Sequence, residues 1–183
     1  MNEIAEIQGG GTPDSGNSEY WDGKINWFTP TEVTNQGYLR KSKRKITELG
    51  LKKSSAKLLP VGSVLMTSRA GIGAMGILAE KAATNQGFQS IIPHTGVPSN
   101  FVYSMQQKVS RVANKLASGS TFTEISGKQL AKIEIAIPNS NVEKALIGDL
   151  FERMDTLIAV NQRAPDPPPQ MKILRCLHRK INS

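Results

Sequence analysis

The pattern of apolar and polar positions changes its period several times along the chain. An apolar run at 63–67 predicts a short buried strand, and other apolar stretches predict strands at 4–7, 25–28 and 88–92. Isoleucines at alternate positions of 133–137 predict a further strand, half-buried and closed by a proline. The first three quarters of the chain are therefore expected to build a sheet.

Helical spacing interrupts this strand pattern. One helical turn is predicted at 47–50, with Thr47 as its cap and Gly50 as its stop. A longer helix should open at 98–100 and end at Gly119. Its apolar face would consist of Phe101, Met105, Val109, Val112 and Leu116. Strands and helices intermixed in this way predict an α/β (or α+β) domain with a mixed sheet, covering residues 1–138.

A long helix of a different kind is predicted at 139–163. Ser140 and Glu143 form a capping box, no proline follows up to Arg163, and the helix would be roughly 33 Å long at ~1.5 Å per residue. A heptad pattern predicts a partner helix, and Asn161 is a polar group that could fix the register. The alternative is that the helix folds back on its own domain. The partner-facing residues are Ile147, Leu150, Met154, Leu157 and Asn161.

Positive charge is concentrated in one window of the chain. The formal net charge is +8, and the window 40–57 holds eight lysines and arginines against Glu48 alone. A concentrated surplus of this kind points to a polyanion, most commonly nucleic acid. The alternative is a solvated face without a ligand. The last segment, 164–183, is a proline-broken basic tail.

A glycine-rich stretch follows the central strand. Residues 71–76 match the G-x-G-x-x-G pattern of dinucleotide-binding loops, but no carboxylate lies between Glu80 and Glu124 to meet a ribose. A nucleotide-dependent enzyme is therefore a weak alternative, and a glycine-rich turn without a ligand is another. We find no nucleophile–base pair with supporting context and expect a binding protein that is not an enzyme.

Cysteine and histidine are too scarce for a metal cluster. Cys176 is the one cysteine, and only His94 and His178 accompany it, so neither an intramolecular disulfide nor a zinc site is expected. We expect no cofactor. The beginning of the sequence does not resemble a signal peptide, and no apolar run has membrane-spanning length, so a cytoplasmic protein without membrane contact is expected.

The candidate nucleic-acid-binding residues lie in the basic window and in polar loops that follow strands. Hydroxyl and arginine side chains suit phosphate oxygens, whereas arginine, lysine, asparagine and glutamine can also read base edges. Asn85 and Gln86 have an alternative role, which is to tie the backbone of their loop together. The full set is Thr31, Arg40, Lys41, Lys43, Arg44, Lys45, Ser68, Arg69, Asn85, Gln86, Ser120 and Thr121.

Several phrases, taken in order, resemble one protein family. They are 10–13 (Gly-Gly-Thr-Pro), 20–27, 58–73, 84–87 (Thr-Asn-Gln-Gly) and 117–121. They are followed by the strand that ends at Pro138 and by the helix with Leu150, Phe151, Asp155 and Ile158. Together these phrases resemble the specificity (S) subunit of type I restriction–modification enzymes over residues 1–163.

The resemblance implies a DNA target recognition domain at 1–138 and a coiled-coil spacer helix at 139–163. Family S subunits look like two such units in tandem, each reading half of a bipartite double-stranded DNA site. With one unit, this sequence resembles a half-subunit, and we expect a homodimer through the helix. The implied partners are the methyltransferase (modification) subunit and, through the complex, the restriction or motor subunit. The sequence departs from the family after Arg163. A general RNA-binding module is the remaining alternative.

Overall fold

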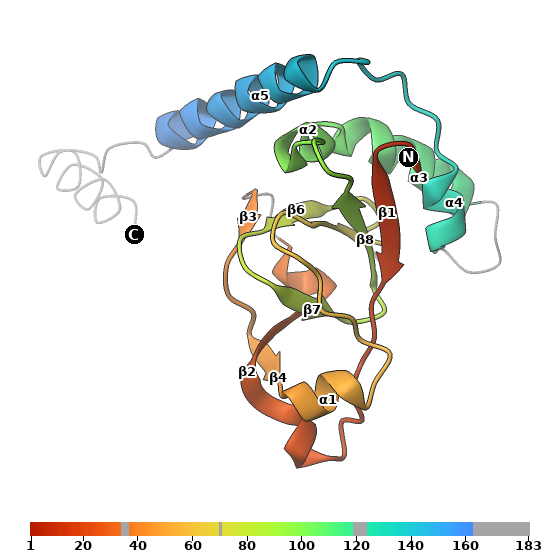
Figure 1. Cartoon of the computed structure of the whole chain (residues 1–183), viewed down its shortest axis with the longest axis vertical. Helices are drawn as coiled ribbons and strands as arrows, with labels where there is room; N and C mark the ends of the chain where they lie inside the picture. Colours follow the sequence, from red (N-terminus) through yellow and green to blue (C-terminus); the bar gives the residue numbers. More distant parts are fainter. Residues whose placement is uncertain (34–36, 70, 119–123, 163–183) are drawn as a thin grey trace, which may run out of the picture. The chain divides into compact units, whose positions relative to one another are not determined.

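The computed structural model describes residues 1–33, 37–69, 71–118 and 124–162 (Figure 1). The chain divides into two compact units, Met1–Asp149 and Leu150–Ser183. The elements in chain order are β1 (Ala5–Gly9), η1 (Ser18–Tyr20), β2 (Trp21–Phe28), η2 (Pro30–Glu32), β3 (Tyr38–Leu39), β4 (Arg44–Ile46), α1 (Glu48–Lys52), β5 (Val64–Thr67), β6 (Met75–Leu78), β7 (Ala82–Thr84), β8 (Phe88–Pro93), α2 (Ser99–Ser104), α3 (Gln106–Ala117), α4 (Gly127–Ala131) and α5 (Asn141–Gln162).

Two mixed sheets form the frame of the first unit. The larger sheet has the order β1-β8-β5-β6-β3, and its pairs are antiparallel except for β3 and β6, which run parallel. The smaller sheet has the order β4-β2-β7, with β2 antiparallel to β4 and parallel to β7. Mixed sheets combined with helices confirm the fold class that the sequence predicts.

Strand β5 lies in the middle of the larger sheet and is buried on both faces. Val64 and Met66 belong to the cluster that α2, α3 and α4 complete. Leu65 belongs to a second cluster on the opposite face, together with Phe28 of the smaller sheet and Phe88. Because neighbouring side chains of a strand point to opposite faces, burial on both faces requires an uninterrupted apolar run. The prediction of a buried strand here is confirmed.

The helix predicted from residue 98 to Gly119 is two helices, α2 and α3. The break falls at Met105, just after Ser104, whose hydroxyl donates to the carbonyl of Phe101 at 2.7 Å and competes with the backbone bonds. The apolar face continues across the break, with Phe101, Met105 and Val109 buried as predicted. In α3 the buried residues are Val109, Ala113 and Ala117, whereas Val112 and Leu116 are exposed.

Two further local predictions differ from the structure. The segment 133–137 forms no strand, so the strand prediction is wrong. Ile133 is nevertheless buried, and Ile135 and Ile137 are half-buried. Helix α4 precedes this segment and packs against β1, and β1 remains the terminal strand of the larger sheet. Thr47 does cap α1, but Gly50 lies inside that helix, where its Cα approaches the backbone of Tyr20.

The first turns of α5 pack on the first unit. Lys144 is buried, Ile147 is half-buried against the cluster that contains Phe101, and Gly148 approaches the backbone of Phe101. A Cβ at Gly148 would lie 2.8 Å from the Phe101 nitrogen, which explains the one glycine of this helix. The alternative in which the helix folds back on its own domain therefore describes these turns. The compact unit continues to Asp149, past residue 138.

Two glycines at the end of β1 have very different surroundings. A Cβ at Gly10 would lie 2.0 Å from the carbonyl oxygen of Asn85 and 2.6 Å from that of Thr84, so only glycine allows these two backbones to approach. The neighbouring backbone bond, from Gly11 N to Thr84 O, measures 2.8 Å. At Gly9 the nearest atom to a Cβ would be a side-chain oxygen of Gln89 at 3.8 Å.

We expect Gly10→Ala to lower the free energy of unfolding by about 2 kcal/mol or more, because the methyl group must displace backbone atoms. Gly9→Ala is the matched control, and a change within about 0.5 kcal/mol is expected there. Urea unfolding followed by circular dichroism measures both. Equal stability of the two variants would show that the contact between the loops at 10–12 and 84–87 is not tight.

Candidate nucleic-acid interface

Backbone hydrogen bonds bring four loops together, and we call this region the loop edge. It comprises residues 10–12, 29–32, 68–69 and 84–87. The nitrogen of Asn85 donates to the carbonyl of Phe28 at 3.1 Å, and the nitrogen of Ser68 donates to the carbonyl of Gly87 at 2.8 Å. Segments that are distant in the sequence thus form one polar surface.

The two amide side chains of the loop at 84–87, Asn85 and Gln86, have different roles. The Oδ1 atom of Asn85 accepts a hydrogen bond from Gly87 N at 2.9 Å and closes the turn. Gln86 is exposed and accepts a hydrogen bond from the Thr12 hydroxyl. Asn85 therefore ties the loop backbone, as the alternative in the sequence analysis stated, while Gln86 stands at the surface.

The loop at 29–32 connects the loop edge to the basic window. The carboxylate of Glu32 accepts from Thr29 N at 2.8 Å through Oε2 and from Lys43 N at 2.6 Å through Oε1. Thr31 is exposed, and its hydroxyl lies 3.2 Å from that of Thr29. One carboxylate thus holds two loops side by side, with the Thr31 hydroxyl near the surface.

Residues 40–45, which we call the basic loop, are held by a buried carboxamide. The side chain of Asn26 donates to the carbonyl of Arg40 at 3.3 Å and accepts from Ser42 N at 3.4 Å. The Ser42 hydroxyl in turn accepts from Trp27 N at 2.9 Å. These bonds fix the backbone of the loop while its cationic side chains remain exposed. The exposed cations are Arg40, Lys41, Lys43, Arg44 and Lys45.

Arg44 has a structural contact of its own. Its guanidinium lies over the ring of Trp21, 3.5 Å from the ring centroid, and 5.9 Å from that of Trp27. The two indoles meet edge to face, with centroids 5.1 Å apart, above the small core under α1. A cation on an indole face is stabilised by the ring quadrupole, so Arg44 also covers this core.

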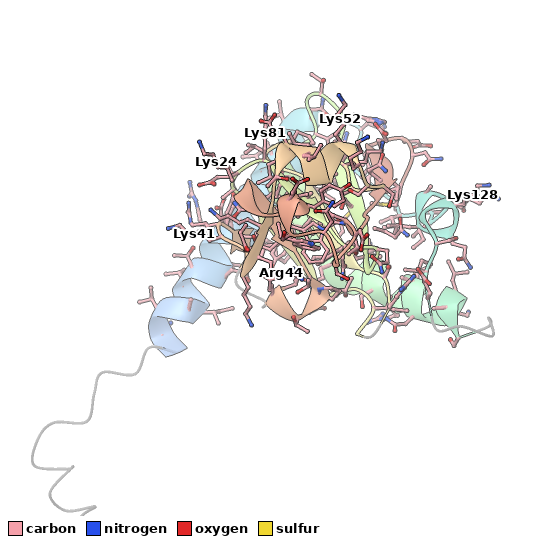
Figure 2. All side chains as sticks on the ribbon, turned by 90° about the horizontal axis from the view of Figure 1, so that it is seen from below. Lys24, Lys41, Arg44, Lys52, Lys81 and Lys128 are labelled. Carbon is pink, nitrogen blue, oxygen red and sulfur yellow. The ribbon has the colours of Figure 1, made fainter. Side chains whose placement is uncertain are left out.

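Two lysines that the sequence analysis missed lie beside the basic loop. Lys24 precedes Asn26 on β2, and Lys81 directly precedes β7, which pairs with β2 on its other side. Figure 2 shows Lys24, Lys41 and Lys81 projecting on the same side of the unit, with Lys128 of α4 far from them. The register of β2 with two strands brings these lysines together, and that register was not predicted.

One candidate hydroxyl residue is buried beneath the surface, and two others lie outside the described residues. Ser68 is fully buried, and its Oγ has no hydrogen-bond partner among the described residues. Burial removes Ser68 from the set that can meet a phosphate, so that prediction is corrected. Ser120 and Thr121 lie outside the described residues.

Arg69 is exposed and has an acidic neighbour that the sequence analysis did not single out. Its Nε lies 3.1 Å from Oε2 of Glu124, and half of the Arg69 side chain is accessible to solvent. The two residues are 55 positions apart in the chain (124 − 69). The sequence contained no signal for this pair, because tertiary packing alone brings them together.

The glycine-rich stretch after β5 forms the turn of the hairpin between β5 and β6. Strand β6 follows it and runs antiparallel to β5, whereas a dinucleotide-binding loop leads into a helix. Gly71 and Gly73 adopt positive φ angles of 71° and 96°. A Cβ at Gly73 would lie 2.2 Å from the hydroxyl of Ser110 on α3, so this loop packs on that helix. The structure disfavours the nucleotide-cofactor alternative.

Two further searches concern only residues 1–33, 37–69, 71–118 and 124–162. Among them, no three His, Cys, Asp or Glu side chains come together as the ligands of a metal ion would. Within the same residues, none of the helices combines the length and the apolar character that crossing a membrane requires.

Solved structures with the same fold were found at low sequence identity. One comes from work on the structural basis of complex assembly and conformational transition of the type I R-M system; the TM-score is 0.69 at 20% identity, over 90% of this chain and 39% of that chain. Another is the HsdS subunit from Thermoanaerobacter tengcongensis, with a TM-score of 0.69 at 17% identity, over 94% of this chain and 40% of that chain. These likenesses concern the fold.

Curated relatives are more similar in sequence. The chain is 37% identical over 162 residues to the Type I restriction enzyme MjaIX specificity subunit of Methanocaldococcus jannaschii, covering 86% of this chain and 37% of the relative. It is 28% identical over 166 residues to the EcoR124I/EcoR124II specificity subunit of Escherichia coli, covering 86% and 40%. The chain thus spans about two-fifths of the length of these relatives.

The family comparison covers both the sheet domain and the whole of α5. The matching family model is described as the type I restriction modification DNA specificity domain, and it aligns with residues 1–166. The phrases that carry the resemblance in the sequence lie within this range, and the basic loop and loop edge are part of it. The chain therefore belongs to the family of type I restriction modification DNA specificity domains.

Proposed function

We propose that this chain recognises a specific sequence in double-stranded DNA as a specificity subunit of a type I restriction–modification system, with one recognition domain. The observation that carries the proposal is the basic loop, whose exposed cations stand on a backbone pinned by Asn26 and Glu32. The proposed role is not catalytic. The chain would bring methyltransferase and nuclease subunits to a bipartite DNA site. The cytoplasm remains its expected location.

The two parts of the interface suit different features of a duplex. Lysines of the basic loop, together with Lys24 and Lys81, would neutralise phosphates and supply attraction for any sequence. The loop edge presents Thr31, Gln86 and Arg69, whose groups can bond to phosphate or base edges. Base reading is assigned to the loop edge because its side chains emerge from backbones that are bonded to one another.

We expect the chain to prefer duplex DNA over single-stranded RNA. A fluorescent duplex is bound first, and unlabelled duplex DNA or single-stranded RNA of equal length then competes for the protein at fixed salt. Duplex DNA should displace the probe at lower concentration, because single-strand binders rely on exposed aromatic stacking platforms, and aromatic residues make up only 5% of this sequence. Better competition by RNA, or binding of S-adenosylmethionine or NAD by the chain alone, would support the rival functions.

We expect the triple change Lys41→Gln, Lys43→Gln and Lys45→Gln to weaken binding to all duplexes. The slope of log K against log salt should fall by about one for each phosphate contact that is lost. Arg44 is left in place because it covers Trp21. Lys128→Gln on α4 is the control and should change the slope less, since Lys128 lies away from the basic loop. An unchanged slope in the triple variant would mark the basic loop as a solvated face.

We also propose that α5 pairs with α5 of a second copy. Several large apolar side chains of α5 are exposed within the second unit, and heptad spacing places Leu150, Met154, Leu157 and Asn161 on one face. Ile147 packs on the first unit, so a partner helix would begin its contacts at Leu150. A two-fold axis would present the same loop edge twice, and the DNA site would then be an interrupted palindrome.

We expect Leu150→Asp combined with Leu157→Asp to yield a monomer with weak and non-specific DNA affinity, because two carboxylates cannot be buried between helices. Multi-angle light scattering measures the mass, and circular dichroism shows whether the helix persists. Thr156→Asp, on the opposite face of the helix by its spacing, is the control and should remain a dimer. A wild-type chain that stays monomeric at high concentration, or that selects an asymmetric site, would contradict the proposed homodimer.

A further inference from the structure

The ion pair between Arg69 and Glu124 lies at the loop edge and is only half exposed. The contact between Nε of Arg69 and Oε2 of Glu124 measures 3.1 Å, and solvent reaches 50% of the arginine side chain and 33% of the glutamate side chain. It is the one salt bridge that the described residues of the chain form. Both residues lie outside the basic loop.

The backbone holds both side chains in place. Ser68 and Ile125, the neighbours of Arg69 and Glu124, are fully buried, and Ile125 N donates to the carbonyl of Ser68 at 3.0 Å. Ser68 N in turn donates to the carbonyl of Gly87. The two side chains therefore leave the surface from adjacent and fixed points of the backbone. The backbone bond between their neighbours keeps the two side chains within pairing distance.

Stability alone is a weak reason for such a pair. Ion pairs at exposed positions contribute about 0.2–1 kcal/mol, because water screens the charges and both side chains lose rotamer freedom. Orientation is the larger consequence. A planar guanidinium whose Nε edge rests on a carboxylate cannot rotate freely, so the direction of its other nitrogen atoms is set.

The chemistry of a guanidinium held in this way favours a base over a phosphate. A guanidinium has five N–H donors in a fixed fork, and a carboxylate at Nε leaves the end with the two Nη groups available. That end matches the O6 and N7 acceptors of guanine in the major groove. The nearby carboxylate of Glu124 repels a phosphate, whereas it tolerates a neutral base edge.

We propose that Arg69 reads a guanine in the recognised half-site and that Glu124 is its positioning residue. This inference rests on the proposed DNA-binding function and deepens it, since it assigns one base position to one pair of side chains. Glu124 touches no DNA in this proposal. It acts by holding Nε of Arg69, so that the two Nη groups face the base edge.

The test is a random-duplex selection with the full chain and its variants, followed by affinity measurements on single-base variants of the selected site. The wild-type chain should require guanine at one position of each half-site. Arg69→Ala should lose about tenfold or more in preference at that position alone. Its salt slope should stay unchanged, because no phosphate contact is removed. Arg69→Lys keeps the charge without the fork and should lose most of the same preference.

Glu124→Gln isolates the positioning role, because it keeps the shape of the side chain and removes its charge. The preference for guanine should weaken at the position that Arg69→Ala affects, while the other positions keep theirs. Glu134→Gln, an equal charge change at an exposed residue outside the loop edge, is the control and should bind as the wild type does. Thermal unfolding of each variant shows whether the fold is retained.

Three results would overturn the inference. One is a uniform loss of affinity for all sequences in Arg69→Ala with a shallower salt slope, which marks a phosphate contact. Another is an unchanged guanine preference in Glu124→Gln. The third is a changed preference at a different base pair, which would mean that Glu124 contacts a base itself. A wild-type chain that selects no sequence would overturn the proposed function as well, so the two failures can be told apart.

Discussion

The proposed interface depends on the buried carboxamide of Asn26. Five cations stand within six consecutive residues at 40–45, and two unit charges ~7 Å apart repel by about 0.6 kcal/mol in water. Asn26 donates to the carbonyl of Arg40 and accepts from the nitrogen of Ser42, and these hydrogen bonds oppose the repulsion and hold the backbone of the loop. Without such bonds the cations could still attract DNA, but they would not present a fixed pattern of charge.

The layered core gives the loop edge a rigid base. Strand β5 is buried on both faces, so its carboxyl end, from which Arg69 emerges, is held by two clusters of apolar side chains. Well-packed interiors move little, and groups that leave such strands keep their positions. Gly10 then lets its loop approach the backbone of the loop at 84–87, and Gly87 leaves room for the side chain of Pro30. The packed apolar interior thus fixes the positions of the polar side chains at the loop edge.

In the proposed function, affinity and specificity belong to different parts of the unit. The basic loop has no ion pair among the described residues, so its charge is available to a polyanion. Arg69 is neutralised locally by Glu124, which makes it a poor general attractor and a better reader of neutral base edges. This division agrees with the general behaviour of protein–DNA interfaces, in which phosphate contacts position the protein and base contacts specify the sequence.

Local patterns in the sequence determined the elements whose cause is local. The apolar run of β5, the Thr47 cap of α1 and the long α5 were predictable because periodicity and caps act within a few residues. The clustering of charge at 40–57 was likewise visible in the sequence. The family resemblance followed from the ordered phrases and the fold class from the intermixed strand and helix patterns, and both were confirmed.

Tertiary packing decided what depends on distant partners. Ile133–Ile137 alternate as a strand does, yet a strand also needs a free neighbouring edge, and α4 packs there against β1. Ser68 looked like a surface hydroxyl, but it is fully buried, and its own backbone is bonded to Gly87 and Ile125. The Arg69–Glu124 pair and the joining of Lys24 and Lys81 to the basic loop depend on strand register and loop contacts. The sequence by itself determined the candidate residues and the excess of positive charge. The tertiary structure removed Ser68, added Lys24 and Lys81 and decided which candidates stand together, because hydrogen bonds and burial between distant segments set the direction of each side chain.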